Sequence, residues 1–350
     1  MAGDAGVTGI DPDSWQVTVL PLPKRFSRGT ALGFCGGHVV GRAETARAKS
    51  LACWWPGGKP ELLTLEGHEY LCAGRAGGDV IPGHWIDPKS GGLRAVVWRL
   101  QGGRLVGASL HDSQYENSWA TAASGDAAVG IGDLPRKPDQ RGLKVGLLWR
   151  AGERAKVAGA SDVTLEATDG TRVAGSLNAR ATLWPSTTSA PIDLAPARMP
   201  MSEVEALDGE LQIGIAWKGM CARAALWRGT AASFTDLTPK GFESGRCHAG
   251  AGGFQVGFVR ATDTTRNGSA AVDNRAALWQ GAADRWLDLN VLLPAKKYNA
   301  SVAWAIEIRG EAMRICGQAT RYEVSDPGTP RELHFEPVAH PVLWTARLGG

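Results

Sequence analysis

The chain has 350 residues, of which 43% are hydrophobic and 21% charged, and its formal net charge at pH 7 is +3. This composition is typical of a soluble globular protein, and the near balance of charge argues against binding of nucleic acid or anionic membrane through a global positive field. The segment Met1 to Trp15 has three aspartates and no apolar stretch, so it does not resemble a secretory signal, and no apolar run is long enough to span a bilayer. We therefore expect a cytoplasmic protein.

A short strand that ends in Trp recurs along the whole chain. Two copies, Arg223–Trp227 and Arg275–Trp279, both read Arg-Ala-Ala-Leu-Trp, and five looser copies end at Trp55, Trp98, Trp149, Trp184 and Trp344. By subtraction, successive copies are between 35 and 65 residues apart. A repeat near forty residues that contains several short apolar strands is typical of a β-propeller blade.

Each repeat contains four expected strands in the same order. In the fifth repeat they are Glu203–Leu207, the Gly-flanked Gly209–Gly214, the Trp strand Arg223–Trp227, and Phe234–Pro239. Asp-Gly and Gly-Gly pairs mark tight turns between strands, and a Pro at the end of the fourth strand suits an outer edge. The pattern predicts four antiparallel strands per blade.

The seventh Trp strand runs to Leu348 near the end of the chain, so it has no fourth strand after it. The segment Trp15–Pro23 matches Trp286–Pro294 in its first Trp, its apolar pattern and its last Pro. We therefore expect the N-terminal strand to complete the last blade and close the ring, which removes an open sheet edge. The prediction is an all-β, seven-bladed β-propeller in one domain, residues 13–350, after a flexible segment, residues 1–12.

These motifs resemble a known family. A Gly-x-Val-Val-Gly-like strand, then Ala-Ala-Leu-Trp, then a Leu-rich strand is similar to the bacterial HAF-type propeller repeat. The resemblance implies the fold and no catalytic residues. Proteins with that repeat are mostly described as exported, and we do not transfer that location because this chain lacks the features of a signal.

The innermost strands carry an unusual set of polar residues. Four positions before the first-turn glycines stand Thr121, Glu166, Glu205, His248 and Ile306, and six positions before them stand Trp119, Thr164, Glu203, Arg246 and Trp304. Residues between these positions are small or apolar, and strand side chains alternate between faces, so the polar set shares the face toward the channel. Glu is almost never fully buried without a partner, so these acids need an explanation.

Three explanations stay open: the residues line a watery channel mouth, form ion pairs between blades such as Glu205 with Arg246, or form a ligand pocket or active site. In an active site, neighbouring carboxylates would give an acid and a base near neutral pH, and His248 would move protons. The candidate catalytic residues are then Glu166, Glu205 and His248, with Trp119, Thr121, Glu203, Arg246 and Trp304 as substrate-binding residues. A Glu/Glu/His metal site has no close-spaced ligand motif in its favour, so we expect no metal and no cofactor.

The connections between the second and third strands vary most in length, and in a propeller they lie on the same face as the connections between blades. The longest are Arg260–Asn274 and Gln318–Ala339, so the expected site lies at this loop-bearing mouth of the channel. The function predicted first is binding of a small-molecule or protein ligand there by a monomer. An acid/base enzyme for a small organic or sugar-like substrate is second, and a lectin third. In either of the first two, Glu205→Gln would remove the function with little change in thermal unfolding.

The six cysteines are scattered without a Cys-x-x-Cys pair, so they are expected to be reduced thiols in the core rather than disulfides or zinc ligands.

Overall fold

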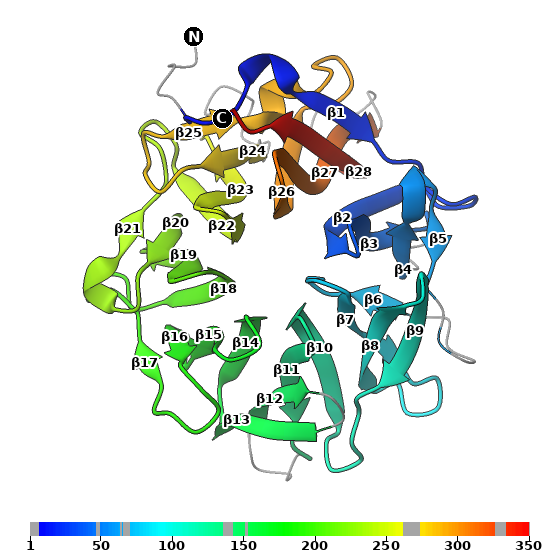
Figure 1. Ribbon diagram of the computed structural model, residues 1–350, viewed down its shortest axis with the longest axis vertical. Helices are drawn as coiled ribbons and strands as arrows, with labels where there is room; N and C mark the ends of the chain where they lie inside the picture. The colour runs from blue at the N-terminus through cyan, green and yellow to red at the C-terminus, as the bar shows by residue number, and fades with distance from the viewer. Residues whose placement is uncertain are drawn as a thin grey trace.

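The structure is a computed structural model that describes residues 7–46, 50–63, 65, 71–135, 143–150, 153–261, 274–325 and 334–349. It contains seven four-stranded antiparallel sheets arranged as blades around a ring (Figure 1), which confirms the predicted fold. Short 3-10 turns accompany them: η1 (Pro12–Ser14), η2 (Pro56–Gly58), η3 (Ala231–Ser233) and η4 (Leu289–Leu292). Among the described residues, no helix has the length and apolar character needed to cross a membrane.

The strands of the first four blades follow the chain in order. They are β2 (Arg28–Cys35), β3 (His38–Glu44), β4 (Ser50–Trp55) and β5 (Glu61–Leu62); β6 (Leu71–Ala73), β7 (Val80–Ile86), β8 (Leu93–Gln101) and β9 (Arg104–Ser109); β10 (Asn117–Ser124), β11 (Ala127–Asp133), β12 (Lys144–Arg150) and β13 (Glu153–Ser161); and β14 (Val163–Thr168), β15 (Val173–Leu177), β16 (Arg180–Trp184) and β17 (Ile192–Asp193). The first strand of each blade is the innermost.

The last three blades have the same order except at the closure. They are β18 (Ser202–Asp208), β19 (Leu211–Lys218), β20 (Cys221–Trp227) and β21 (Thr235–Asp236); β22 (Ser244–Ala251), β23 (Phe254–Arg260), β24 (Asn274–Trp279) and β25 (Trp286–Asp288); and β26 (Ala300–Arg309), β27 (Ala312–Ser325) and β28 (His334–Arg347), with β1 (Gln16–Val19) as the fourth strand.

The N-terminal strand closes the ring as predicted. β1 pairs antiparallel with β28, from Gln16 opposite Thr345 to Val19 opposite Val342, and Figure 1 shows the blue and red strands side by side. The preceding residues also contact the closing blades: Ile10 bridges Leu348, the amide of Asp11 donates to the carbonyl of Arg347 at 2.9 Å, and that of Thr8 donates to Gln280 at 3.0 Å. The contacts of residues 8–11 thus extend the closure beyond β1.

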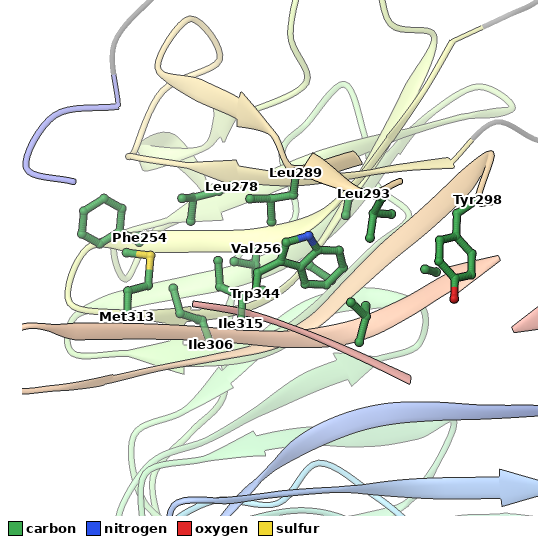
Figure 2. Packing of buried hydrophobic residues seen from close by; sticks show 14 residues of the cluster. Phe254, Val256, Leu278, Leu289, Leu293, Tyr298, Ile306, Met313, Ile315 and Trp344 are labelled. Atoms are coloured by element: carbon green, nitrogen blue, oxygen red, sulfur yellow. The ribbon is translucent and has the colours of Figure 1, made fainter. Parts of the chain in front are cut away.

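The recurrent Trp packs one blade against the next. It lies on the third strand of every blade, is at most 5% exposed, and belongs to a separate buried cluster between two blades in each of the seven cases. Figure 2 shows the cluster between the sixth and seventh blades, with Trp344 in its middle near Val256 and Ile315. The core is therefore a ring of seven interblade layers, and burial of these large aromatic side chains holds the blades at a fixed spacing.

Hydroxyl groups add a polar connection between neighbouring blades. The buried amide of Ala181 on β16 donates to Oγ of Ser202 on β18 at 3.0 Å, and that of Ala276 on β24 donates to Oγ of Ser301 on β26 at the same distance. Ser118 on β10 accepts in the same way from Ala95 on β8, and within the fifth blade Thr238, just after β21, accepts from Ala224 on β20. Each hydroxyl satisfies an amide that the short fourth strand leaves unpaired, so the contact rigidifies the ring around the channel.

A β-bulge interrupts six of the innermost strands. The register with the second strand shifts by one residue at Leu32, Thr121, Glu166, Glu205, His248 and Trp304. A bulge bends a strand and re-aims the side chain of the extra residue, and bulges are common next to binding sites. Five of the six bulged side chains, all except that of Thr121, border the cavity described below.

The repeated glycine of the second strand exists because of this bulge. A Cβ at Gly214 would lie 2.0 Å from the carbonyl oxygen of Glu203, and equivalent glycines oppose the other bulges at 1.9 to 2.0 Å: Gly41, Gly130, Gly175, Gly257 and Gly317. These obstacles are backbone atoms, which cannot rotate away. The Gly-flanked pattern in the sequence thus results from the bulges in the adjacent strand.

We expect Gly214→Ala to lower the free energy of unfolding by about 2 to 3 kcal/mol, because the methyl group forces the two strands apart. Denaturant unfolding followed by circular dichroism measures this loss. Gly349→Ala is the control, since a Cβ there meets nothing within 4 Å, and it should be close to neutral. Equal stability of the two variants would contradict this explanation of the repeat.

The long connections differ from the expectation. In the seventh blade most of the expected loop Gln318–Ala339 is a ladder, because β27 and β28 stay paired out to Ser325 opposite His334. Residues 326–333 and most of the other long connection, residues 262–273, lie outside the described residues. The length variation thus reflects, in part, an extended hairpin.

Four of the six cysteines occupy buried positions, as expected of thiols in the core. Cys35, Cys53, Cys247 and Cys316 are buried and free, and Cys221 is free and partly exposed. Burial raises the pKa of Cys35 and of Cys53 to about 12, so these thiols stay protonated and unreactive.

Candidate functional site

A cavity of about 210 Å³ lies in the channel at the centre of the ring, and we name it the central cavity. Its walls come from all seven innermost strands or the residues directly after them. The polar and aromatic residues that border it are Arg75, Ser124, Glu166, Thr168, Glu205, His248 and Trp304. Small or aliphatic residues such as Ala76, Ala167, Leu207 and Ile306 complete the wall. A small pocket with a few convergent polar groups on a rigid scaffold has the character of a ligand site.

The central cavity lies on the opposite side of the bulges from the expected site. The bordering residues of each strand are the bulged residue and those that follow it toward the hairpin, for example Glu205 to Leu207 on β18 and His248 to Gly250 on β22. The connections between second and third strands lie at the other end of these strands. The central cavity therefore lies on the strands that the sequence indicated, toward their hairpin ends.

Glu205 is the most completely bonded of the predicted residues. It is 1% exposed, and its carboxylate accepts from Arg75, from Nε of Arg246, and from Nδ1 of His248 at 2.7 Å. Arg75 also donates to the backbone carbonyl of Glu205. Burial alone would raise the pKa of Glu205, but His248, Arg75 and Arg246 together outweigh burial and hold it well below its usual range. We name these four residues the Glu205 network.

The Glu205 network contains the Glu205–Arg246 ion pair that the sequence raised as one alternative, and it also contains a residue that the sequence did not indicate. Arg75 follows β6 in the second blade, whereas Glu205 lies in the fifth, so the guanidinium reaches across the channel. Burial would lower the pKa of Arg75, but the carboxylates of Glu205, Glu166 and Glu203 raise it, so the side chain stays charged. Charged side chains from the second, fifth and sixth blades thus meet across the channel at the level of the bulges.

Glycines position Arg75. A Cβ at Gly74 would lie 2.5 Å from the carbonyl oxygen of Thr121, and one at Gly77 would lie 2.2 Å from that of Ala123. This close approach lets the amide of Arg75 donate to Thr121 at 2.9 Å, in a parallel bridge between the second and third blades. The segment Gly74–Gly78 therefore lies nearer the axis than a regular strand would.

His248 and Trp304 form an aromatic wall of the central cavity. Their rings stack with centroids 4.1 Å apart and planes 30° apart, and Phe258 lies against the imidazole at 5.7 Å. Burial lowers the pKa of His248, and Arg75 and Arg246 add to this, so Glu205 offsets the effect only in part. The ring is then neutral at pH 7, Nδ1 donates to Glu205, and Nε2 is a buried acceptor without a partner among the described residues. Nε1 of Trp304 likewise lacks one.

The position of Trp304 also corrects the sequence alignment. Counting back from Gly310 set Trp304 level with Arg246, but its bulge is the equivalent of the bulge at His248. The last innermost strand, β26, runs two residues further into its hairpin than the count assumed, because Arg309 still pairs with Ala312. Trp304 rather than Ile306 is therefore the neighbour of His248.

Glu166 is the second carboxyl group that borders the central cavity, and it does not belong to the Glu205 network. It is partly exposed, and no cation or hydrogen-bond donor among the described residues is paired with it. Burial raises the pKa of Glu166 to about 7, Glu203 and Glu205 raise it further, and Arg75 and Arg246 act in the opposite direction. At neutral pH this carboxyl therefore exchanges between its two protonation states.

The other predicted residues are not among the described residues that border the central cavity. Thr121 uses its hydroxyl to bind the carbonyls of Val129 and Leu165, which ties two blades together. Glu203 accepts from Thr164 at 2.8 Å, and burial raises its pKa. Trp119 lies under Nζ of Lys144, 5.9 Å from its ring centroid. With Arg246, these residues occupy the loop-side half of the strands.

Among the described residues, no group of three or more His, Cys, Asp or Glu could hold a metal ion. Both carboxylate oxygens of Glu205 already accept hydrogen bonds, so it acts on His248 rather than on a ligand. The Glu166 carboxyl is the group left for a ligand, because the unpartnered Nε2 of His248 and Nε1 of Trp304 are buried.

No family model and no curated protein matches the chain. The HAF-type resemblance therefore rests on short motifs alone. Solved structures similar to this chain include TolB from Acinetobacter baumannii (12% identity, TM-score 0.47, 76% of this chain and 64% of that chain covered) and a putative TolB from Agrobacterium tumefaciens (10%, 0.46, 66% and 84%). An acylaminoacyl peptidase from Pyrococcus horikoshii is also similar (9%, 0.47, 83% and 49%). The chain spans less than two thirds of the length of the first of these. At this level of similarity we transfer no function.

Proposed function

We propose that this chain is a binding propeller that holds a small ligand in the central cavity without catalysing a reaction. The observation that carries the proposal is that Glu166, His248 and Trp304, from three different blades, border one cavity, and that the Glu166 carboxyl has no partner among the described residues. Unpartnered buried polar groups are costly, and a ligand that satisfies them gains the energy that the free protein lacks. The rigid ring around them reduces the ordering cost of binding.

An acid/base enzyme is the second candidate, and one observation favours it. The carboxylate of Glu205 orients His248 through Nδ1 and leaves Nε2 free, as the orienting acid does for a general base. Burial lowers the pKa of His248, which weakens it as a base, and the central cavity holds no candidate nucleophile beyond the hydroxyls of Ser124 and Thr168. We therefore rank binding above catalysis.

The remaining alternatives have less support. A lectin with one sugar pocket per blade would repeat its polar residues, whereas the bulged positions of successive blades differ in chemistry. A site at the loop-bearing mouth would use Trp119, Glu203 and Arg246, which do not border the central cavity. A monomeric and cytoplasmic state remains part of the proposal, and light scattering after gel filtration would measure the mass in solution.

A fragment screen by ligand-observed NMR on the full chain tests the proposal. We expect hits whose binding is lost in Trp304→Leu, a change to the cavity wall, and retained in Trp119→Leu, which removes an indole outside the cavity. Fragments that still bind Trp304→Leu but no longer bind Trp119→Leu would show that the site lies on the loop side instead. A screen without hits in the wild type would contradict a small-ligand site altogether.

A further inference from the structure

Charge is distributed unevenly around the central cavity. The ionisable groups that face Glu166 are Arg75 from the segment after β6, Glu203 and Glu205 from β18, and Arg246 and His248 from β22. Both arginines donate to Glu205, and His248 does so through Nδ1. Every cationic or donor side chain of this set is therefore engaged by one carboxylate, and Glu166 receives none of them.

Glu166 is the carboxyl group of the central cavity without a hydrogen-bond partner among the described residues, and the cation beside it, Arg75, is bonded to Glu205 through two of its five N–H groups. The carboxylate of Glu166 requires a donor, whereas the unpartnered Nε2 of His248 and Nε1 of Trp304 are buried atoms that a ligand in the cavity does not reach. A protonated amine has three N–H donors and no acceptor, so it can donate to the Glu166 carboxylate and neutralise its charge. A carboxylate ligand would add a like charge beside Glu166.

The size and lining of the central cavity limit the body of the ligand. A volume of about 210 Å³ suits a small molecule or a single side chain. Alanines and the aliphatic residues Leu207 and Ile306 border the remainder of the cavity. Such a lining suits a short alkyl chain.

We infer that the ligand of the central cavity is a small organic cation, an alkylammonium group that binds the Glu166 carboxylate against the His248–Trp304 wall. This inference rests on the proposed function and narrows it to one ligand class. The ammonium belongs to a free small amine or to a lysine side chain of a peptide, because both present the same group on an alkyl chain. Neither a neutral polyol nor a carboxylic acid supplies the missing positive charge.

The test uses three four-carbon probes that differ in charge: n-butylamine, 1-butanol and butyrate. A tripeptide that is acetylated at its N-terminus and contains a lysine with a free ammonium group is the fourth. Isothermal titration or NMR titration of the full chain at pH 8 gives the four affinities. We expect n-butylamine to bind at least about 10-fold more tightly than 1-butanol, since a hydrogen bond to a charged group is stronger than one between neutral groups, and butyrate not to bind. Tighter binding of the tripeptide than of n-butylamine would assign the ammonium to a peptide, and the reverse order to a free amine.

Two matched variants locate the binding. Glu166→Gln should weaken n-butylamine binding by about 10-fold or more, whereas Glu203→Gln removes the same charge from outside the cavity and should change it by less than about 3-fold. Affinity should also rise between pH 6 and pH 8 in the wild type and not in Glu166→Gln, because only ionised Glu166 attracts the cation. Thermal unfolding of both variants verifies that they are folded.

The outcomes separate this inference from the proposed function. If 1-butanol or butyrate binds preferentially and Trp304→Leu abolishes this binding, the ligand is not a cation, but the cavity is still a ligand site. Binding of n-butylamine that responds equally to Glu166→Gln and Glu203→Gln would overturn the role of Glu166. If none of the probes binds and the fragment screen also fails, both the inference and the proposed function are wrong.

Discussion

Replacing Glu205 with glutamine is expected to lower the free energy of unfolding by about 3 kcal/mol, the largest effect of any single conservative substitution in the channel. Glutamine keeps the shape but removes the negative charge that Arg75, Arg246 and His248 share. Loss of one partner from a buried ion pair typically costs about 3 to 5 kcal/mol, because the other partner stays buried without compensation. Partial exposure of both arginines places the estimate at the lower end.

Denaturant unfolding of Glu205→Gln beside Glu210→Gln measures this loss. Glu210 is 87% exposed and pairs with Arg172 at the surface, so its substitution should leave stability nearly unchanged. The expectation from sequence alone was the reverse, that Glu205→Gln would spare thermal unfolding and affect only function. That expectation did not include Arg75, which reaches across the ring and donates to Glu205. Wild-type stability of Glu205→Gln would contradict the Glu205 network.

The second large effect is a dependence of stability on pH that comes from Glu166. Its pKa in the folded protein is about 7, against an ordinary value of 4.5, so between these values the folded state binds more protons than the unfolded state. The free energy of unfolding must then fall as pH rises from about 4.5 to about 7, and level off above. At about 1.4 kcal/mol per pH unit, the loss from this group is no more than about 3 kcal/mol.

Glu166→Gln removes this group and should therefore be more stable than the wild type at pH 8 and equal to it at pH 4.5. Subtracting the two stability curves isolates Glu166, because Glu205 and the other carboxyl groups titrate in both proteins. Chemical denaturation at half-unit steps from pH 4.5 to pH 8.5 is the measurement. Parallel curves over this range would mean that Glu166 has an ordinary pKa and no unpaired charge in the channel.

The repeat determined most of what could be predicted about the fold. The Trp of each third strand sits between blades because a large aromatic residue at a fixed spacing packs best where two sheets face each other, and Trp344 and Trp279 do so. The match of Trp15–Pro23 to Trp286–Pro294 correctly predicted closure through β1 and β28. Both inferences depend on local pattern, which a repeat displays several times over.

The candidate site was only partly predictable, for a physical reason. Alternation along a strand indicated that Glu166, Glu205 and His248 share a face, and the bulges preserve that relation between neighbouring blades. Arg75 belongs to a glycine-rich segment with no counterpart in the other blades, and its partner is 130 residues away in the sequence. A contact across a ring leaves no periodic signal in the sequence. Such a contact decides which carboxylate is neutralised and which stays unpaired.

The most direct measurement of the central claim is the pKa of Glu166 by NMR of its side-chain carboxyl carbon, with and without saturating n-butylamine. We predict a pKa near 7 in the free protein and a clear fall when the amine binds, because the cation stabilises the ionised carboxylate. A pKa near 4.5 in the free protein, or one that does not move at saturation, would contradict the assignment of the central cavity as a site for an organic cation.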